Sequence, residues 1–420
     1  MTERIAIVGL GYVGLPLAVE LARHFDVLGQ DIDEARISEL SRGHDRTDAV
    51  DTVTLTSADI RYTQHPDELF DRTFYVIAVP TPIHHNGAPD LTAIRSASLA
   101  VGKTLRPGDV VVYECTVYPG LTEDQCAGWL ERASGLRVGI DLGLGYSPER
   151  INPGDRTHTL RNIPKIISAS DPQTLDRMRG VYAAIVEVPL HLAPNIRTAE
   201  ACKVIENAQR NVNIAFMNEV ACLLDGIDIS TRDVMDAMAT KWNHLPFHPG
   251  LVGGHCIGVD PYYLVACAEN AGSPMPLLQQ ALRTNNEYAT QLAKQLERRM
   301  GGLQGRRVAV LGLPYKPDVL DLRNTRVPEL CERIVDLGAD VMLHDPLIDP
   351  LVARSELGVT LVPSHRLHDL DAVVLAVPHK FWRDDPTAIA NMLRPNGLIF
   401  DPHKKLRLER VPQGLRYAAV

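Results

Sequence analysis

The segment RIAIVGLGYVGLPLAVELA, residues 4–22, constrains the fold more than any other part of the chain. A short apolar strand leads into a Gly-x-Gly-x-x-Gly turn, and a helical pattern follows at once. In that context the first glycine makes the turn, the second lets the backbone approach a pyrophosphate, and the third lets helix and strand pack closely. The helix N-terminus then offers N–H donors to phosphates. The segment predicts a Rossmann unit that binds a dinucleotide through Gly9, Gly11, Tyr12, Val13 and Gly14.

A second predicted strand ends in Asp31, about twenty residues after the glycine turn, where a carboxylate would bind the adenosine ribose hydroxyls. The same carboxylate would repel a 2′-phosphate, so NAD is favoured over NADP as the cofactor. Arg36 qualifies this preference, since a nearby arginine could accommodate that phosphate. Both side chains are included in the predicted cofactor site.

The pattern of strands and helices changes twice along the chain. Compact β-branched strands are expected at residues 4–8, 25–30, 73–79 and 109–114, separated by helices, which is typical of a parallel α/β sheet. Long helices are expected from Ile196 and from Pro276 to about Met300, and strands resume at 307–313, 339–344, 372–377 and 398–401. The sequence thus predicts an α/β protein with two Rossmann-like domains (1–195 and 301–420) joined by an all-α central domain of long helices (196–300).

Composition narrows the classes of function. A chain of 420 residues is long enough for two or three domains, and its net charge of −9 argues against nucleic-acid or anionic-membrane surfaces. The N-terminus enters a strand directly, and no apolar run is long enough to span a bilayer. The seven cysteines are scattered without a CxxC pair, which disfavours disulfides and a structural zinc site and favours a reducing cytoplasm. No metal is expected.

Three further segments carry residues capable of chemistry. YSPERINPGD contains Glu149 and Arg150, and a helical segment places Lys203 and Asn207 four residues apart on one face. Taken singly, these are most often solvated charges. The third segment, GLVGGHCIGVDPYYL, places a cysteine in a glycine-rich loop where it could be a nucleophile, a metal ligand or a bystander. A metal is the poorest of the three, because adjacent His and Cys side chains project differently.

If these segments converge on the nicotinamide, their residue types form a coherent catalytic set. A cysteine thiolate attacks carbonyl carbons well at neutral pH. A lysine ammonium and an asparagine amide can stabilise negative charge on a substrate oxygen, while a glutamate and an aspartate can move protons and position water. Because a simple alcohol dehydrogenase has no use for a thiol, the combination suggests oxidation of an aldehyde to an acid through a thioester.

The whole set of motifs resembles the UDP-glucose/GDP-mannose dehydrogenase family over nearly the full length of the chain. The matching runs, in order, are GLGYVGLPLA, VPTP, YECTVYPGLTE, YSPERINPGD, AEACKVIENAQRNVNIAFMNE, GGHCIGVDPYYL, VLGLPYKPDVLDLRNTR and HDPLID. Within the family, YSPERINPGD and LPFHPGLVGGHCIGVDPYYL are similar to the bacterial UDP-N-acetylhexosamine 6-dehydrogenases that make uronic acids for surface polysaccharides such as Vi and O antigens.

The resemblance implies a four-electron oxidation of the sugar C6 alcohol of UDP-GlcNAc or UDP-GalNAc, with two NAD⁺ consumed. By the family's motifs, Cys256 would be the nucleophile, Lys203 and Asn207 would stabilise the oxyanion, and Asp260 and Glu149 would serve water and proton transfers. Further cofactor contacts are implied for Pro80, Thr81, Thr116 and Arg323. Substrate contacts are implied for Glu149, Arg150, Ile151, Asn152, Lys203, Asn207, His248, Gly250, Gly253 and Lys316.

The resemblance also implies a UDP-binding C-terminal domain and a homodimer built on the helical middle, although the apolar stripe in residues 198–224 could equally be intrachain core. Two positions depart from the family pattern. Pro317 follows Lys316 where Glu or Lys is usual, and His248 stands where relatives often have Arg or Tyr. Proline fixes φ and removes an N–H, so Pro317 affects the local path of Lys316. Both departures bear on substrate binding and not on the catalytic set.

Three other functions remain open. The nearest is a UDP-glucose or GDP-mannose dehydrogenase with the same mechanism. A two-electron hydroxy-acid dehydrogenase related to the 6-phosphogluconate enzymes also pairs a helical Lys and Asn, but lacks the GGHC cysteine and the third domain. A non-enzymatic NAD-binding regulator would bind the cofactor and turn over no nucleotide sugar.

Overall fold

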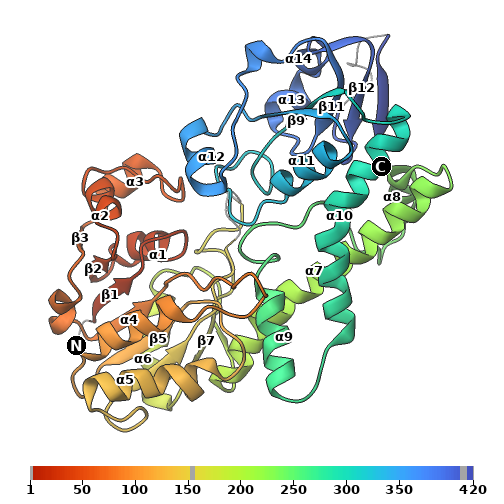
Figure 1. Ribbon diagram of the computed structural model, residues 1–420. Coiled ribbons are helices and arrows are strands. Elements are labelled where there is room, and N and C mark those ends of the chain that lie inside the picture. Colours follow the sequence, from red (N-terminus) through yellow and green to blue (C-terminus); the bar gives the residue numbers. More distant parts are fainter. Residues whose placement is uncertain (1–2, 152–156, 407–413, 420) are drawn as a thin grey trace. The chain divides into compact units, whose positions relative to one another are not determined.

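The computed structural model describes residues 3–151, 157–406 and 414–419, and its chain forms two compact units (Figure 1). The first unit comprises residues 1–207 and 259–274, and the second comprises residues 208–258 and 275–420. The long helix α7 (Ile196–Gly226) contributes to both units.

The first unit is built on an eight-stranded sheet in the order β3-β2-β1-β4-β5-β6-β7-β8. Neighbouring strands run parallel, except that β6 and β7 are antiparallel. The strands are β1 (Arg4–Val8), β2 (Asp26–Gln30), β3 (Ile60–Thr63), β4 (Phe74–Ile77), β5 (Val110–Tyr113), β6 (Gly143–Tyr146), β7 (Ile166–Ala169) and β8 (His191–Leu192). The first six strands follow the order of a Rossmann sheet.

Both faces of this sheet are covered by helices, which explains why the central strands β1, β4 and β5 are mostly apolar and do not alternate. On one face Ala6, Tyr75 and Val111 pack with residues of α4 (Thr92–Gly102) and α5 (Ala127–Ser134). On the other face lie α1 (Gly14–Leu21) and α6 (Pro172–Ala183). The remaining helices of this unit are α2 (Glu34–Ser41), α3 (Thr52–Ser57), η1 (Pro66–Asp71), η2 (Thr122–Cys126) and α9 (Asp260–Asn270).

Aspartate caps set the starts of several helices. The side chains of Asp33, Asp51 and Asp171 accept backbone N–H groups at the starts of α2, α3 and α6. Such caps satisfy N–H donors that have no partner within the helix. In α6 the cap is followed by Pro172, which is favoured at the first helical position.

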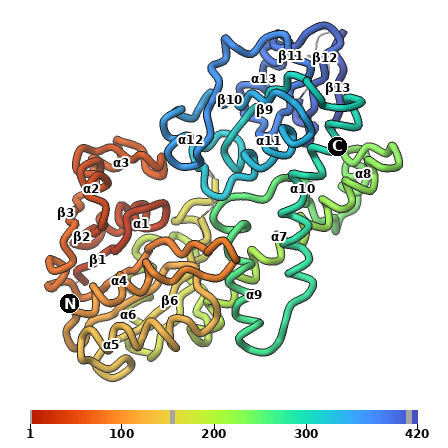
Figure 2. The backbone as a smooth tube through the Cα atoms, viewed as in Figure 1, coloured from red at the N-terminus to blue at the C-terminus, as the bar shows by residue number. Residues whose placement is uncertain are grey.

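The second unit contains a five-stranded parallel sheet in the order β10-β9-β11-β12-β13. Its strands are β9 (Arg307–Leu311), β10 (Asp340–His344), β11 (Leu370–Leu375), β12 (Leu393–Asp401) and β13 (Arg416–Ala419). Its helices are α8 (Thr231–Met238), α10 (Pro276–Met300), α11 (Val327–Asp336), α12 (Pro350–Leu357), α13 (Lys380–Asp384) and α14 (Thr387–Ala390), with η3 (Ser364–Arg366). Figure 2 traces the chain through α7 and α8 (green) and later through α10 into this sheet (cyan to blue).

The predicted fold class is confirmed: two parallel α/β sheets and long intervening helices are present. The predicted strands and both long helices are found within a few residues of their expected bounds. Strands β3, β6, β7, β8 and β13 were not predicted. The three-domain division stays a prediction, because the helical middle is shared between the two compact units and is not a separate one.

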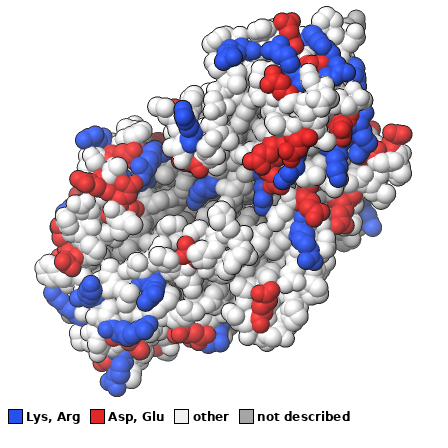
Figure 3. Space-filling model, in the orientation of Figure 1, with Lys and Arg blue, Asp and Glu red and all other residues white. Residues whose placement is uncertain are grey.

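The distribution of charged side chains on the surface is consistent with the modest net charge of −9. In Figure 3, basic and acidic side chains are interspersed over the face that is drawn. Within the described ranges, no helix is long and apolar enough to cross a membrane.

We expect Trp382→Ala to destabilise the second unit by about 3–5 kcal/mol, because truncating a buried aromatic leaves a cavity. Trp382 is 1% exposed and its ring lies 5.4 Å from that of His379. Its neighbour Phe381 is 58% exposed, so Phe381→Ala is the matched control and should cost about 0.5 kcal/mol or less. Urea denaturation of both variants measures the difference, and equal losses of stability would contradict this packing.

Candidate active site

The glycine turn between β1 and α1 has the geometry that a bound pyrophosphate requires. Gly9 has φ +93°, and a Cβ on Gly14 would lie 1.8 Å from the Gly9 carbonyl oxygen, so neither position tolerates a side chain. A Cβ on Gly11 would meet nothing within 4 Å, so space remains above the turn. Tyr12 and Val13 complete the turn and are half-buried. These residues fit a dinucleotide phosphate at the α1 N-terminus.

Asp31 follows β2 and is tied to the glycine turn. One of its carboxylate oxygens accepts the N–H of Leu10 at 2.8 Å, and the other accepts the N–H of Asp33 at 3.0 Å. The carboxylate is therefore held beside the turn, where a ribose would lie.

Arg36 is buried beneath the same turn, and its charge is already compensated. Its Nε donates to the Leu10 carbonyl at 2.9 Å, and its guanidinium forms an ion pair with buried Asp45 at 2.8 Å. An arginine engaged in this way is poorly placed to neutralise a 2′-phosphate, which agrees with NAD as the cofactor. Direct contact between Arg36 and the cofactor stays a prediction.

The other predicted cofactor residues of this unit lie at the carboxyl ends of neighbouring strands. Pro80 and Thr81 follow β4, and Thr116 follows β5. Strand β4 pairs with both β1 and β5, so these loops meet the glycine turn at one edge of the sheet. Ligands of open α/β sheets bind at this edge. Pro80 is exposed, Thr116 is half-buried and Thr81 is buried.

Four of the predicted catalytic residues form two buried pairs in the first unit. Lys203 Nζ donates to the backbone carbonyl of Glu149 at 2.5 Å, and Asn207 Nδ2 donates to Asp260 Oδ2 at 2.5 Å. Lys203 and Asn207 lie one turn apart on α7, as the spacing predicted. A lysine, an asparagine and two residues with carboxylates thus lie together. The face of α7 that carries Lys203 and Asn207 is buried and not solvated.

The loop around Glu149 is joined to the same helix. The guanidinium of Arg150 pairs with Glu206 of α7 at 2.9 Å and donates to the Pro164 carbonyl at 3.1 Å. Ile151 is half-buried, and Asn152 lies outside the described residues.

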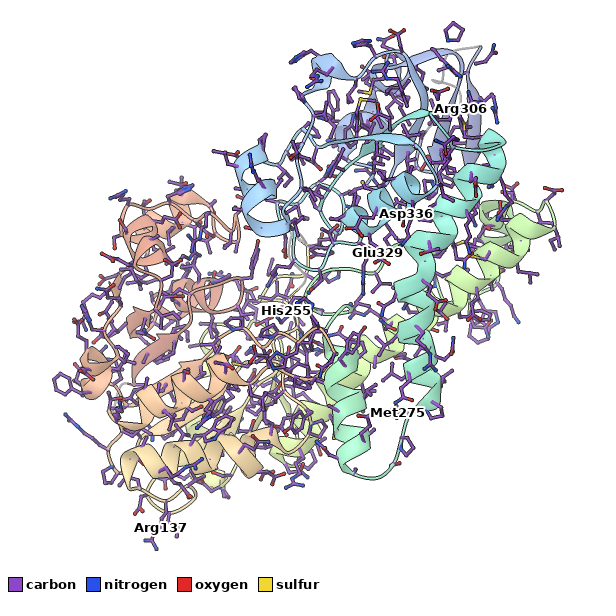
Figure 4. All side chains as sticks on the ribbon, in the orientation of Figure 1. Arg137, His255, Met275, Arg306, Glu329 and Asp336 are labelled. Atoms are coloured by element: carbon purple, nitrogen blue, oxygen red, sulfur yellow. The ribbon has the colours of Figure 1, made fainter. Side chains whose placement is uncertain are left out.

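Cys256 belongs to the second unit, where its glycine loop packs against the loop that carries Lys316 and Arg323. A Cβ on Gly253 would lie 2.7 Å from the carbonyl oxygen of Asn324, and the N–H of Gly254 donates to the Arg323 carbonyl at 3.0 Å. The paired glycines are therefore needed for close approach of two backbones. Figure 4 labels His255, which precedes the half-buried cysteine on the loop between α8 and α9.

Two buried asparagines of α7 and one of α10 hold this cysteine loop, and the sequence reasoning missed all three. Asn218 binds Gly250 twice, accepting its N–H at 2.8 Å and donating to its carbonyl at 3.2 Å. Asn211 donates to the Ile257 carbonyl at 3.1 Å. Asn285 of α10 donates to Asn211 and accepts from Asn218, each at 3.0 Å. The network fixes the backbone on both sides of Cys256.

Glu200, also missed, holds the loop that follows Thr116. Both of its carboxylate oxygens accept backbone N–H groups, from Gly120 at 2.5 Å and from Thr122 at 2.9 Å. Burial raises the pKa of Glu200 to about 7. The available signal was its position on α7, since polar residues at 200, 203, 207, 211 and 218 recur at helical spacing in a helix with many apolar residues.

The loop around Pro317 is held by a buried histidine. Asp318 has φ +62°, and its N–H donates to Nδ1 of His379 at 2.9 Å. Because Nδ1 accepts, Nε2 carries the proton and donates to Asp345 at 2.9 Å. The backbone after Lys316 is thus anchored despite the proline. Lys316 itself lies over the ring of Tyr315, with its Nζ 5.5 Å from the ring centre.

The remaining predicted contacts of the second unit stay predictions. The Arg323 guanidinium forms a bidentate pair with Asp321, at 2.9 and 2.6 Å. His248 is exposed over much of its surface, and loss of water from the covered part of its ring, together with nearby Lys405, lowers its pKa. In the described part of the chain, no three His, Cys, Asp or Glu side chains are grouped to hold a metal ion, and none of the seven cysteines forms a disulfide.

Comparison with known proteins agrees with this geometry. Three models of the UDP-glucose/GDP-mannose dehydrogenase family match in order: the NAD binding domain at residues 3–186, the central domain at 197–287 and the UDP binding domain at 309–407.

Similar proteins match over nearly the whole chain. Protein CapL of Staphylococcus aureus is 44% identical over 405 residues, covering 96% of each chain. The UDP-N-acetyl-D-glucosamine 6-dehydrogenase of Pseudomonas aeruginosa is 42% identical, covering 91% of this chain and 92% of its own. The structure of a UDP-D-ManNAc dehydrogenase from Pyrococcus horikoshii superposes with a TM-score of 0.88 at 28% identity, covering 99% and 98% of the two chains. The chain therefore belongs to the UDP-glucose/GDP-mannose dehydrogenase family and is an NAD-dependent nucleotide-sugar dehydrogenase.

Proposed function

We propose that this enzyme oxidises the C6 hydroxyl of a UDP-N-acetylhexosamine to the carboxylate, with Cys256 as the covalent nucleophile. The observation that carries the proposal is a half-buried cysteine on a glycine loop whose backbone is bound on both sides by buried asparagines. An alcohol dehydrogenase that stopped at the aldehyde would need no such thiol. The N-acetylhexosamine is supported by the 42% identical relative that is named for UDP-N-acetyl-D-glucosamine.

The chain's own residues account for the steps between the two hydride transfers. The glycine turn and Asp31 would hold NAD⁺, which would supply the hydride acceptor for C6 in each of the two oxidations. In the first, a basic group takes the hydroxyl proton and leaves an aldehyde, to which the Cys256 thiolate adds as a thiohemiacetal. The second oxidation converts the thiohemiacetal to a thioester, and attack by water then releases the carboxylic acid and the thiol.

Lys203 and Asn207 suit the oxyanion in these steps, since an ammonium and an amide N–H donor lie one turn apart on a rigid helix. Glu149 and Asp260 suit the proton transfers and the positioning of water, because both carboxylates are buried beside these donors. Lys316 and Gly253 belong to packed loops of the second unit, and we assign these loops to the UDP-sugar.

The uronic acid so formed would feed the synthesis of a surface polysaccharide. UDP-GlcNAc and UDP-GalNAc differ only in the orientation of one hydroxyl. A UDP-glucose or GDP-mannose dehydrogenase would use the same residues with a different sugar pocket, and it is the alternative tested below. The thiol form of all seven described cysteines suits a reducing cytoplasm.

We expect two NADH per sugar when UDP-GlcNAc or UDP-GalNAc is limiting, measured by absorbance at completion. UDP-glucose and GDP-mannose, run in parallel, rank the substrates by kcat/KM. One NADH per sugar would mean that the reaction ends at the aldehyde and would remove the role given to Cys256. Turnover with UDP-glucose or GDP-mannose alone would keep the mechanism and overturn the substrate.

Cys256→Ala should lower acid formation by about 10³-fold or more, because the covalent step has no other nucleophile. Cys256→Ser should stall as an ester that intact-protein mass spectrometry detects as an added mass. Cys331→Ala is the matched control, since Cys331 is a half-buried thiol on α11 with a pKa that burial raises to about 12. Acid formation by Cys256→Ala at the wild-type rate would refute the covalent mechanism.

We propose that the enzyme is a homodimer that pairs through α7. Phe216 and Leu223 are 61% and 62% exposed and lie seven residues apart on one face of this helix, and Ile227, 55% exposed, directly follows its end. A contiguous stripe of exposed apolar side chains is typical of a protein–protein interface.

Phe216→Asp combined with Leu223→Asp should convert the dimer to a monomer in sedimentation velocity at micromolar concentration, because charges would be buried without partners. Leu351→Asp, at a 76% exposed position of α12, is the control and should leave the mass unchanged. A wild-type protein that sediments as a monomer would overturn the assignment.

A further inference from the structure

A cluster of buried charged groups lies beside Glu149 in the first unit. Lys165 directly precedes β7, and its Nζ donates to Glu114 Oε2 at 2.8 Å. Glu114 directly follows β5 and accepts a second hydrogen bond, at 2.5 Å, from the hydroxyl of Tyr182 on α6. The side chains of Lys165 and Glu114 are 4% and 0% exposed.

The two carboxylate oxygens of Glu149 have different surroundings. Oε1 accepts the backbone N–H groups of Arg150 at 2.6 Å and of Ile151 at 2.5 Å. Oε2 is buried, accepts no hydrogen bond from any described residue, and lies 3.7 Å from Lys165 Nζ. Oε2 therefore feels the ammonium charge while its lone pairs remain available for a proton or a water molecule.

We propose that Lys165 and Glu114 act as a pair of positioning residues that set the proton affinity of Glu149, an inference that rests on the proposed function of Glu149 in proton transfer. The ammonium of Lys165 favours the ionised form of Glu149, and the negative charge of Glu114 reduces that effect. The two charges act in opposite directions on one carboxyl group.

Burial makes this control strong. Opposite charges within a few ångström shift a carboxyl pKa by about one to three units in a protein interior. Burial alone would lower the pKa of Lys165, yet Glu114 and Glu149 outweigh it and hold that pKa above its ordinary value. Burial raises the pKa of Glu114 even though Lys165 lies against it. The direct hydrogen bond between the two groups favours the charged form of each.

The other charged groups near Glu149 are accounted for on each surrounding element. Lys203 of α7 donates to the Glu149 backbone carbonyl. The charge of Arg150 is compensated by Glu206. The ring of Tyr182 lies 5.2 Å from Lys165 Nζ, and Tyr146 of β6 donates to the Cys115 carbonyl. Lys165 is a described cation that faces the Glu149 carboxylate, with its Nζ 3.7 Å from Oε2.

A purely structural role for the ion pair, joining β5 to the start of β7, makes a different prediction. Loss of a structural pair would lower stability and turnover without moving the pH at which Glu149 loses its proton. A small pocket is lined by both Glu149 and Lys165, together with Pro148, Ile151, Ile163 and Pro164.

The test compares the pH profile of kcat/KM for the wild type, Lys165→Met, Glu114→Gln and the double variant. Lys165→Met should move the acid limb to higher pH by about one unit or more, since Glu149 then loses the ammonium that favours its ionised form. Glu114→Gln should move the limb to lower pH, because the ammonium then acts on Glu149 undiminished. The double variant, which leaves neither charge of the pair unpartnered, should lie between the two.

Acid limbs that coincide in all four proteins, or single variants that shift in the same direction, would overturn the proposal. Should Lys165→Met fail to fold, Glu114→Gln and the double variant still give limbs at different pH if the proposal holds.

A titration that needs no turnover separates this proposal from the proposed function. The infrared carbonyl band of the protonated Glu149 carboxyl is identified by its loss in Glu149→Gln and followed with pH in each variant. Opposite shifts of that band in the two single variants support the charge control even if no UDP-sugar is oxidised. An unmoved band would refute the charge control even in an active enzyme.

Discussion

A line of buried polar side chains along α7 is the constraint on which the rest of the site depends. The buried face of a helix normally carries apolar side chains. An unpaired amide or ammonium in a protein core costs several kcal/mol of stability, roughly 2–7 for an amide in apolar surroundings. Glu200 and Lys203 meet this cost in the first unit, and Asn211 and Asn218 meet it in the second, by bonding to loops, while Asn207 bonds to Asp260 at the start of α9. The helix therefore holds these segments within each unit, and each segment carries a residue of the predicted site.

Close contact between backbones is the second requirement, and glycine provides it in each unit. The dinucleotide turn brings Gly14 against the Gly9 carbonyl, and the cysteine loop brings Gly253 against the Asn324 carbonyl. In both places a Cβ would overlap a backbone atom. A backbone atom cannot move aside as the end of a flexible side chain could, so a substitution for glycine is not tolerated there. A turn can thus be placed within hydrogen-bond distance of a ligand or of another loop.

Buried charge is the third feature, and it distinguishes the carboxylates of the first unit from one another. Glu200 is stabilised by two backbone N–H donors, and Glu114 by a lysine and a tyrosine. Among the described residues, Glu149 accepts hydrogen bonds at one oxygen only and faces a cation with the other. Three buried glutamates in one domain are therefore stabilised by different partners, although their side chains are chemically identical.

The sequence alone determined the fold class and the NAD turn, because these rest on local patterns, and it predicted a catalytic set through its resemblance to a known family. Strand–turn–helix glycines, a carboxylate at the end of β2 and a Lys–Asn pair four residues apart are each defined within a few residues of chain. Tertiary structure alone decided which side chains support them. Nothing in the sequence pairs Lys165 with Glu114, 51 residues away, or joins Asn285 to Asn211 across 74 residues. Such contacts depend on strand order and on helix packing, which bring distant segments together for reasons that no local pattern records.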